Sequence, residues 1–457
     1  MALSLRVAAV AAGGALLAAA PAVAAAVSAA YATAAATALR AAVRDVHILT
    51  LAPTCGAACT AATGSRLAAV GCDRVRLFPA VGMAAAHCAP AAVAATRGST
   101  AGAVVVTLAN LPGVVAVTPD GVAALPPTRP PAAADAADAA AATVGAPGGA
   151  PFPPAPRQPG GGGAGGSRFW GLDRINQVRL PLDNVTDTAA CFPRRGAGVT
   201  IYVVDSGLDV RHTQFGGAAG GRVTAMVAPG SDLTSPNDTN GHGSHVAGIV
   251  AGETTGVAPA ASVVGIKALG PSNEAALTDV VSAIDYVAGV KKGKPAAKII
   301  LNASFGTGSA VGAPWTVAAD RAADVGVLFI TAARQDGGDL CVDNPGAAAG
   351  SLTVASSDVA DRRMPGSANG RCVAVIAPGE GVLSVLAGTR SGLVTLSGTS
   401  MAAPHVAGLA ALVLAEANDG GALRKEDVLK AITQGAPTVG GLSLAFVGRK
   451  CVASMGG

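Results

Sequence analysis

One serine lies where a long apolar helix is predicted to begin. Ser400 is part of SGTSMAAPHVAG at residues 397–408, and the chain then continues without a charge until Glu416. The small residues Gly398 and Thr399 let the backbone approach a bound carbonyl group. At a helix N-terminus, free N–H groups and the macrodipole stabilise negative charge on a nearby oxygen. Ser400 is therefore a candidate nucleophile whose own N–H can donate to an oxyanion, provided that a base activates it.

Two upstream segments supply a base and a group that orients it. In GVTIYVVDSG, residues 198–207, a run of β-branched and apolar residues ends at Asp205, which predicts a buried parallel strand with a carboxylate at its carboxyl end. In NGHGSHVAG, residues 240–248, His242 lies between two glycines before an apolar helical run. His245 is predicted to be an ordinary helix-face residue. The order aspartate, histidine, serine is one of the known chain orders of a catalytic triad.

Each of these residues has a simpler explanation when taken alone. An aspartate after a strand is commonly a turn residue, a histidine between glycines is commonly structural, and a serine before a helix is commonly an N-cap. The three motifs together, in this order, favour catalysis. VVDSG, GHGSHVAG and GTSMAAPHVAG resemble the subtilase family of serine proteases, most closely its proteinase K-like branch. The resemblance implies a peptidase in which Asp205, His242 and Ser400 are catalytic.

The resemblance also implies an oxyanion hole, and here the sequence departs from the family pattern. The family has a strand that ends in AAGN, whose asparagine side chain is the second donor besides the N–H of Ser400. This chain has the strand GVLFITAA followed by Arg334 and Gln335. Gln335 carries the same amide one methylene further out, and Arg334 adds strain if the turn needs a positive φ. We expect a slower enzyme, and full substitution by Gln335 is the alternative.

By the same resemblance, two short segments line the substrate-binding cleft. Their small residues imply an open apolar pocket and cleavage after apolar or aromatic residues, although ordinary edge-strand positions are the alternative. No cofactor is implied for the chemistry. A structural calcium is implied at Asp358 with the carbonyls of Ala349 and Ser351, and a surface turn is the equal alternative. The implied substrate-binding residues are Ser304, Phe305, Gly306, Thr331, Ala332 and Ala333.

The first residues have the pattern of an export signal. Residues 1–26 carry Arg6, an uncharged Ala, Val and Leu run, and small residues before a cleavage position. The uncharged stretch continues to Leu39, so a retained membrane anchor is the alternative. We expect a secreted, extracellular protein, with vacuolar and membrane-anchored locations left open.

Changes in composition divide the rest of the chain into three parts. Residues 43–124 contain the strand-like segments VHILTLA and AVVVTLANL, and the closing LANLPGVVAVTPDGV resembles the subtilase propeptide, a folding template and temporary inhibitor. An unrelated cysteine-stapled domain is the alternative. Residues 125–166 are rich in Pro, Ala and Gly, which predicts a disordered linker where processing occurs. Residues 167–457 form the predicted peptidase domain.

The predicted peptidase domain alternates strands and helices, which favours the α/β class with a parallel sheet covered on both faces. The resemblance gives it a subtilisin-like fold, preceded by a small α+β propeptide domain. Strands are predicted at residues 199–204, 262–268, 298–304, 327–332 and 372–377, and helices at residues 275–290, 313–324, 401–417 and 425–434.

Composition narrows the classes of function. The chain has 457 residues with 51% hydrophobic content, enough to bury a large core. Its net charge of +4 comes without a dense Lys/Arg cluster, which argues against a nucleic-acid partner. Eight cysteines fit an oxidising compartment. The resemblance implies a Cys341–Cys372 disulfide, and a Cys191–Cys451 pair is the remaining option.

We expect a secreted serine endopeptidase, a monomer made as a zymogen, that acts on protein or peptide substrates and is held by its own propeptide as intramolecular inhibitor. Three other classes remain. An inactive homologue that only binds peptides is favoured by Arg334 and Gln335. An acyl transferase or peptide ligase would share every motif. A cysteine-stapled inhibitor would be confined to the N-terminal part.

Overall fold

The computed structural model describes residues 46–70, 72–88, 111, 113–120, 122–124, 168–217, 221–307, 313–335, 337, 341, 346–417 and 424–447. The predicted signal segment, residues 1–26, and all of the predicted linker, residues 125–166, lie outside these residues. The chain divisions predicted from composition therefore stay predictions at both of these places.

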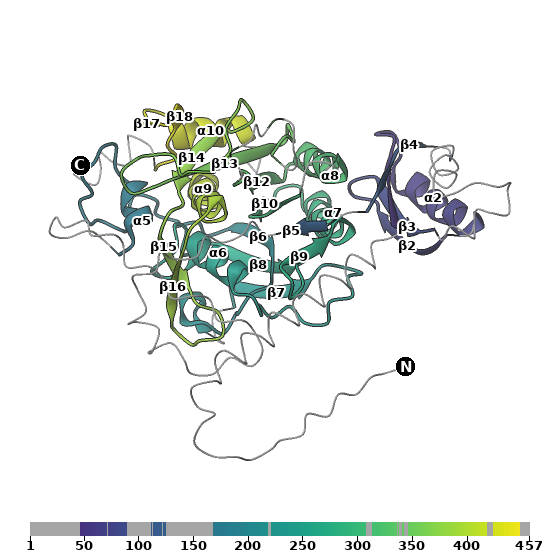
Figure 1. Ribbon diagram of the computed structural model, residues 1–457, viewed down its shortest axis with the longest axis horizontal. Coiled ribbons are helices and arrows are strands. Elements are labelled where there is room, and N and C mark those ends of the chain that lie inside the picture. The colour runs from purple at the N-terminus through teal and green to yellow at the C-terminus, as the bar shows by residue number, and fades with distance from the viewer. Residues whose placement is uncertain are drawn as a thin grey trace, which may run out of the picture.

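A seven-stranded parallel sheet forms the centre of the larger part of the molecule (Figure 1). Its strand order is β14-β13-β12-β10-β6-β8-β7, and every neighbouring pair is parallel. Because helices cover both faces, the strands are largely buried and consist mainly of apolar and small residues. In chain order the strands are β6 (Val199–Asp205), β7 (Val223–Val227), β8 (Ser262–Lys267), β10 (Lys298–Ala303), β12 (Leu328–Ala332), β13 (Ser351–Ser357) and β14 (Val375–Pro378).

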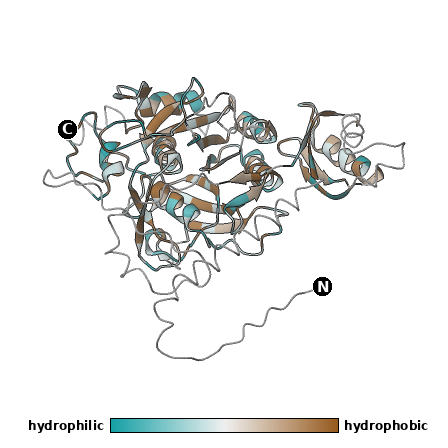
Figure 2. Cartoon of the chain, viewed as in Figure 1, coloured by the Kyte–Doolittle hydropathy of each residue, from teal (hydrophilic) through white to brown (hydrophobic). Residues whose placement is uncertain are grey.

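Helices on the two faces of the sheet make two separate apolar cores. One core includes residues of α6 (His242–Ala251) and α9 (Thr399–Glu416), and the other includes residues of α7 (Leu277–Gly293) and α8 (Ala313–Asp324). The sheet strands are mostly brown in Figure 2, which marks their hydrophobic residues. The smaller elements are α5 (Trp170–Arg174), η3 (Thr213–Phe215), β15 (Val382–Val385), β16 (Leu393–Leu396), α10 (Lys425–Thr433), β17 (Thr438–Val439) and β18 (Leu442–Ser443).

Helix α9 is the central helix of its core. Small residues let it pack tightly: a Cβ at Gly408 would lie 2.4 Å from the Cβ of Val257. Among the described helices, α9 is the one whose length and composition would allow a membrane span, and 89% of that stretch is buried inside the molecule. Tight packing on both sides fixes the N-terminus of α9, where Ser400 lies.

A second, smaller unit precedes the large sheet in the chain. Four antiparallel strands in the order β2-β3-β1-β4 form its sheet, and α2 contacts β2 and β3. The disulfides Cys55–Cys59 and Cys72–Cys88 lie in this unit. Its elements, here called the N-terminal unit, are β1 (Val46–Leu51), α2 (Ala57–Ala69), β2 (Asp73–Phe78), β3 (Met83–His87) and β4 (Val114–Pro119), together with Asp120 and β5 (Val122–Ala124), which follow β4 in the chain.

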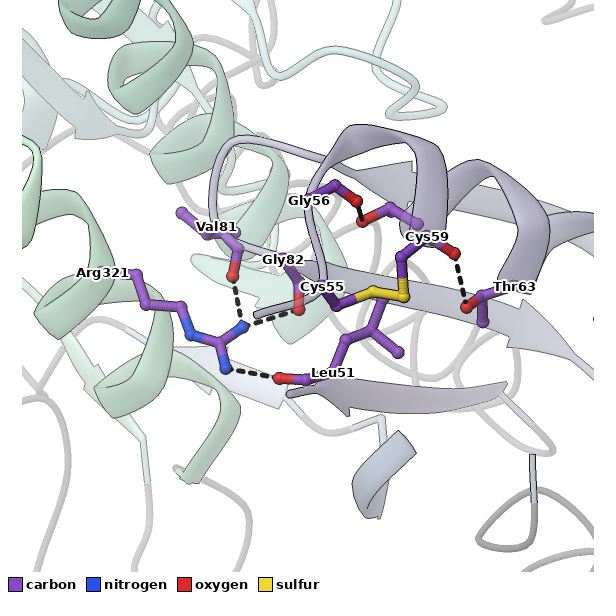
Figure 3. The surroundings of a disulfide bond; sticks show 9 residues. Leu51, Cys55, Gly56, Cys59, Thr63, Val81, Gly82 and Arg321 are labelled. Carbon is purple, nitrogen blue, oxygen red and sulfur yellow. Dashed lines mark hydrogen bonds between the residues drawn. A yellow bond between two sulfur atoms is a disulfide. The ribbon is translucent and has the colours of Figure 1, made fainter. Parts of the chain in front are cut away.

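The N-terminal unit packs against α7 and α8 (Figure 1). The Arg321 guanidinium on α8 donates to the carbonyl oxygens of Leu51, Val81 and Gly82, each at 2.6 Å, beside the Cys55–Cys59 disulfide (Figure 3). On α7, the Asp285 carboxylate accepts the N–H groups of Ala80 at 2.6 Å and Val81 at 2.9 Å. Backbone groups of the N-terminal unit are thus satisfied by charged side chains of the larger part.

The predicted α/β class and parallel sheet are confirmed, and β6, β8, β10, β12 and β14 lie at or near the predicted strands. Strand β13 was not predicted, because SLTVASS is rich in small polar residues, yet all seven are buried. The helix predicted at residues 275–290 begins at Leu277, since Glu274–Ala276 form strand β9.

The predicted Cys341–Cys372 disulfide is present. Cys191 is also disulfide-bonded, and its predicted partner Cys451 lies outside the described residues. The described cysteines include no free thiol.

Candidate active site

The carboxyl end of β6 carries the first candidate residue. β6 has β8 on one side and β10 on the other, so the chain reverses its direction of winding here, which is where open α/β sheets bind ligands. Asp205 is the last residue of β6 and is fully buried. Its Oδ1 accepts the N–H of Ser206 at 2.7 Å, which fixes the plane of the carboxylate.

His242 is the first residue of α6, and its ring contacts Asp205. Nδ1 lies 2.8 Å from Oδ1 and 3.0 Å from Oδ2 of Asp205. Because a carboxylate only accepts hydrogen bonds, Nδ1 must donate, which leaves Nε2 unprotonated in the neutral ring. Gly243 permits this approach: a Cβ there would lie 2.2 Å from the Gly207 carbonyl oxygen and 3.1 Å from the Asp205 Cβ.

His245, one turn further along α6, has a structural role. It is fully buried, and its Nε2 lies 3.1 Å from the carbonyl oxygen of Val382 and 3.0 Å from that of Val394. Burial, aided by the nearby His242, lowers the pKa of His245 to about 3. His245 is thus a neutral ring that holds the β15–β16 hairpin on α6.

Ser400 is the second residue of α9 and is 2% exposed. Its hydroxyl donates to the carbonyl oxygen of Ser304 at 2.6 Å. Because the hydroxyl is engaged there, it does not continue the line from Asp205 to His242 in this conformation. Rotation about χ1 moves a serine hydroxyl between staggered positions. The structure therefore joins two of the three candidate side chains directly and leaves the third to reorient.

The candidate oxyanion donor Gln335 lies beside the residues that lead into α9. A Cβ placed on Gly398 would be 2.9 Å from Oε1 and 3.2 Å from Nε2 of Gln335. Thr399 donates its hydroxyl to the Ala333 carbonyl at 2.6 Å, which ties the end of β12 to the start of α9. Arg334 has no positive φ, so the strain expected if the turn required one does not arise.

The candidate substrate-binding strand already pairs with a segment of the chain itself. β5 (Val122–Ala124) lies between β11 (Gly306–Thr307) and β9 (Glu274–Ala276) in an antiparallel three-stranded sheet. Gly306 pairs with Ala124, and Ala123, which pairs with Thr307 on β11 and Ala275 on β9, is fully buried. The sequence did not predict β9, because three residues directly before a helix are too few to show an alternating strand pattern.

The other predicted cleft residues form buried support for this strand. Ser304 and Thr331 are fully buried, and Thr331 donates to the Ala303 carbonyl at 3.1 Å. Phe305 packs on Trp315 with ring centroids 4.9 Å apart, in the core and not in an open pocket. Ala332 and Ala333, at the end of β12, are 7% and 3% exposed.

The residues around Asp358 do not fit the expected calcium ion. The Asp358 carboxylate accepts the N–H groups of Ala360 at 2.9 Å and Arg362 at 2.8 Å, and the Arg362 guanidinium at 2.7 Å. The ammonium of Lys425 contacts the Ala349 carbonyl that would be a second ligand. Among the described residues, no group of three or more His, Cys, Asp or Glu side chains could hold a metal. Cationic side chains thus already contact two of the three expected ligand groups.

A carboxylate–imidazole pair at the carboxyl edge of a parallel sheet, with a serine at the N-terminus of a neighbouring helix, defines the serine-hydrolase class of site. Residues 196–447, more than half of the chain, match the model of the subtilase family. The chain belongs to the subtilase family, and the predicted subtilisin-like fold is confirmed.

Several relatives are similar over the same region. The alkaline serine exoprotease A of Vibrio alginolyticus is 40% identical over 250 residues, 55% of this chain and 44% of that protein. Subtilisin-like protease 3 of Saccharomyces cerevisiae is 37% identical over 287 residues, 58% of each chain. An extracellular serine proteinase of a Thermus species is 38% identical over 246 residues, 54% of this chain and 56% of that one. The chain thus spans about half the length of these relatives.

A solved structure supports the same assignment. The crystal structure of a cold adapted subtilisin-like serine proteinase is 33% identical, with a TM-score of 0.54 over 62% of this chain and 98% of that one.

Proposed function

We propose that this chain is a secreted serine endopeptidase that hydrolyses peptide bonds through Asp205, His242 and Ser400 and is made as a zymogen. The observation that carries the proposal is the buried hydrogen bond from His242 Nδ1 to Asp205, at 2.8 Å, in a chain of the subtilase family. The extracellular proteinase among its relatives and the described disulfides support secretion.

In the proposed reaction, the Ser400 hydroxyl turns away from the Ser304 carbonyl toward His242. Nε2 of His242 takes its proton as the oxygen attacks the peptide carbonyl, and later gives that proton to the leaving amine. Asp205 holds the ring in the tautomer that leaves Nε2 free and stabilises the imidazolium. The N–H of Ser400 and the amide of Gln335 are the proposed donors to the tetrahedral oxyanion.

The proposed zymogen is held by its own N-terminal unit. β5 pairs with β11 and β9 as an extended peptide substrate would pair with the edge strands of the cleft. The N-terminal unit would therefore exclude substrates until it is released. The small cleft residues at the end of β12, with Gly306, suggest acceptance of apolar side chains.

A fluorophosphonate probe tests the proposal directly. It should label the full-length chain after activation and should fail to label the Ser400→Ala variant, and only the labelled protein should hydrolyse casein. Labelling that persists in Ser400→Ala would assign the nucleophile elsewhere. Absence of both labelling and hydrolysis in an activated, folded sample would contradict the proposal.

A second candidate, an inactive homologue that binds peptides, is favoured by two observations. The Ser400 hydroxyl is engaged by the Ser304 carbonyl, and Gln335 stands where the family has asparagine. Such a protein would bind an unreactive peptide at the β9–β11 cleft without labelling of Ser400. The fluorophosphonate experiment separates the two candidates.

A further inference from the structure

Two buried charges next to the Asp205–His242 pair have no part in the proposed reaction. Lys267 ends β8 and pairs in register with Asp205 on β6. Asp238 lies in the loop before α6. Lys267 is only 4% exposed and Asp238 only 9%. Because burying a charge is costly, charged residues this deep usually have a charged or hydrogen-bonding partner.

The Asp238 carboxylate holds the start of α6. Its Oδ1 accepts the Gly241 N–H at 2.7 Å and the Ser206 hydroxyl at 2.9 Å, and its Oδ2 accepts the Ser244 N–H at 2.8 Å. The Ser206 hydroxyl in turn accepts the Gly243 N–H at 3.0 Å. Asp238 thereby links the residue after Asp205 to residues on both sides of His242.

Backbone packing reinforces this link. Gly207 has φ +115°, and a Cβ there would lie 2.6 Å from the Pro236 carbonyl oxygen and 2.8 Å from that of Asn237. The loop after β6 therefore lies directly on the loop that carries Asp238.

Lys267 supplies the only ammonium group that contacts this network in the described residues. Its Nζ contacts the carbonyl oxygen of Ser206. Burial lowers the pKa of Lys267, while the negative charges of Asp238 and Asp205 act in the opposite direction. One buried ammonium therefore balances part of the charge of two buried carboxylates.

We propose that Asp238, Lys267 and Ser206 are positioning residues that fix the orientation of the Asp205–His242 pair and set the electric field at the imidazole. The inference rests on the proposed function, since it takes His242 as the base. Ser206 provides the mechanical link, because it is hydrogen-bonded to Asp238 and to the N–H of Gly243. Asp238 and Lys267 provide opposite charges, which gives the proposal a test by sign.

The charges that act on His242 through this network come from several elements. Removing the positive charge of Lys267 should favour the imidazolium and raise the pKa of His242, whereas removing the negative charge of Asp238 should lower it. His245 and His405 are neutral near pH 7 because burial lowers the pKa of both. They therefore add no charge that could shift the pKa of His242 in this comparison. The charged or titratable groups linked to the Asp205–His242 pair, directly or through one another, are Asp205 on β6, Lys267 on β8, Asp238 in the loop before α6, His245 on α6 and, beyond it, His405 on α9.

The test is an NMR titration of the His242 ring in full-length Ser400→Ala protein with ¹³C-labelled histidine, with the signal assigned by His242→Gln. Lys267→Met should raise the pKa of His242, and Asp238→Asn should lower it, each by about one pH unit. The double variant should return toward the parent value. The exposed-residue controls Lys294→Met and Asp187→Asn should leave the titration unchanged.

A purely structural role predicts another result, in which both single variants lose stability but shift the titration equally or not at all. That result would overturn the proposal. If Lys267→Met does not fold, Lys267→Arg keeps the charge and should keep the parent pKa of His242, while Asp238→Asn still decides the sign.

The positioning role of Ser206 is tested separately, by the kcat of the active protein. Ser206→Ala keeps both charges, so kcat should fall about 10-fold with the acid limb of the pH profile unmoved. An unchanged kcat would contradict the positioning role of Ser206. Because the NMR titration needs no turnover, a failure of the proposed protease activity would appear in the fluorophosphonate labelling and would not affect this outcome.

Discussion

Gln335 is the residue whose chemistry departs most from the family pattern. Its amide lies against Gly398, at the entry to α9, and the neighbouring Arg334 adopts an ordinary backbone conformation. The longer side chain therefore reaches the start of the helix without backbone strain. This favours an amide that still serves as the second donor to an oxyanion.

Replacing Gln335 by alanine should lower kcat about 10²- to 10³-fold with little change in KM, because the lost interaction forms only in the transition state. That magnitude is the one known for subtilisin, a member of this family. Casein or peptide hydrolysis measures it. Gln335→Asn is the matched comparison: a large gain over the parent would show that the glutamine is a poor substitute.

Two buried histidines should make the fold sensitive to acid. Burial lowers the pKa of His245 to about 3 and that of His405 to about 4, whereas in the unfolded chain each has a pKa near 6.5. The unfolded state therefore binds more protons between these values. The contribution of these two histidines to the free energy of unfolding is fully present above about pH 6.5. It is lost as the pH falls toward their pKa values in the folded protein.

We expect the free energy of unfolding of Ser400→Ala protein to fall between pH 7 and pH 5 by about 2 kcal/mol for each of these histidines. Urea unfolding at the two pH values measures the loss, and the Ser400→Ala background prevents self-digestion. His405→Gln should show a smaller loss than the parent. Equal stability at both pH values would contradict burial as the cause.

At the scale of elements, helices α7 and α8 form the surface that receives the N-terminal unit. Arg321 on α8 satisfies three carbonyl oxygens, and Asp285 on α7 satisfies two N–H groups. These backbone groups lie at the end of β1 and in the turn between β2 and β3, and of the three carbonyl oxygens that of Gly82 also accepts the N–H of Leu51 at 3.1 Å. These polar contacts add to an apolar interface, because Ile48, Phe78 and Val81 of the N-terminal unit lie in the same buried cluster as residues of α7 and α8.

Arg321→Ala should loosen the N-terminal unit and shorten the lag before the full-length protein hydrolyses a peptide substrate at its steady rate, roughly 10-fold. The reason is that three carbonyl groups would lose a charged donor, and each hydrogen bond to a charged group contributes about 1.5–3 kcal/mol. Lys294→Ala, an exposed residue beyond the end of α7, is the control. An unchanged lag in Arg321→Ala would argue against this surface as the contact that delays activation.

The elements also explain how far the sequence could lead. β6, β10 and α9 could be predicted because their long apolar runs leave few alternative structures. The candidate histidine could be predicted because glycines flank it. β13 and β9 were not, since their burial depends on neighbours far away in the chain. The Ser400 hydroxyl contact with Ser304 and the Asp238 network were likewise beyond sequence patterns, because they join residues 96 and 32 positions apart.

For the whole molecule, the main question is how the proposed zymogen would become active. β5 fills the position between β9 and β11, and Ala123 is fully buried there. If this strand blocks the cleft, weakening its pairing should free the site even while the rest of the N-terminal unit stays docked.

Ala123→Asp should therefore give a full-length protein that hydrolyses a short peptide substrate without a lag, since a carboxylate buried between two strands lacks a partner. Val122→Thr is a near-isosteric control on the same strand and should keep the lag. Near-ultraviolet circular dichroism confirms that each variant is folded. A lag as long as that of the parent in folded Ala123→Asp would refute the blocking role of β5.

Asp120, just ahead of β5, contacts the start of α7 and so affects how the N-terminal unit can be released. Its carboxylate accepts the N–H of Thr278 at 3.1 Å and contacts the Thr278 hydroxyl, so a side chain of the N-terminal unit caps the first turn of α7. If that unit left, as proposed, α7 would lose this cap, which disfavours dissociation. Cleavage of the peptide chain would make release of the unit irreversible. We therefore expect maturation to require cleavage and not to occur on dilution alone.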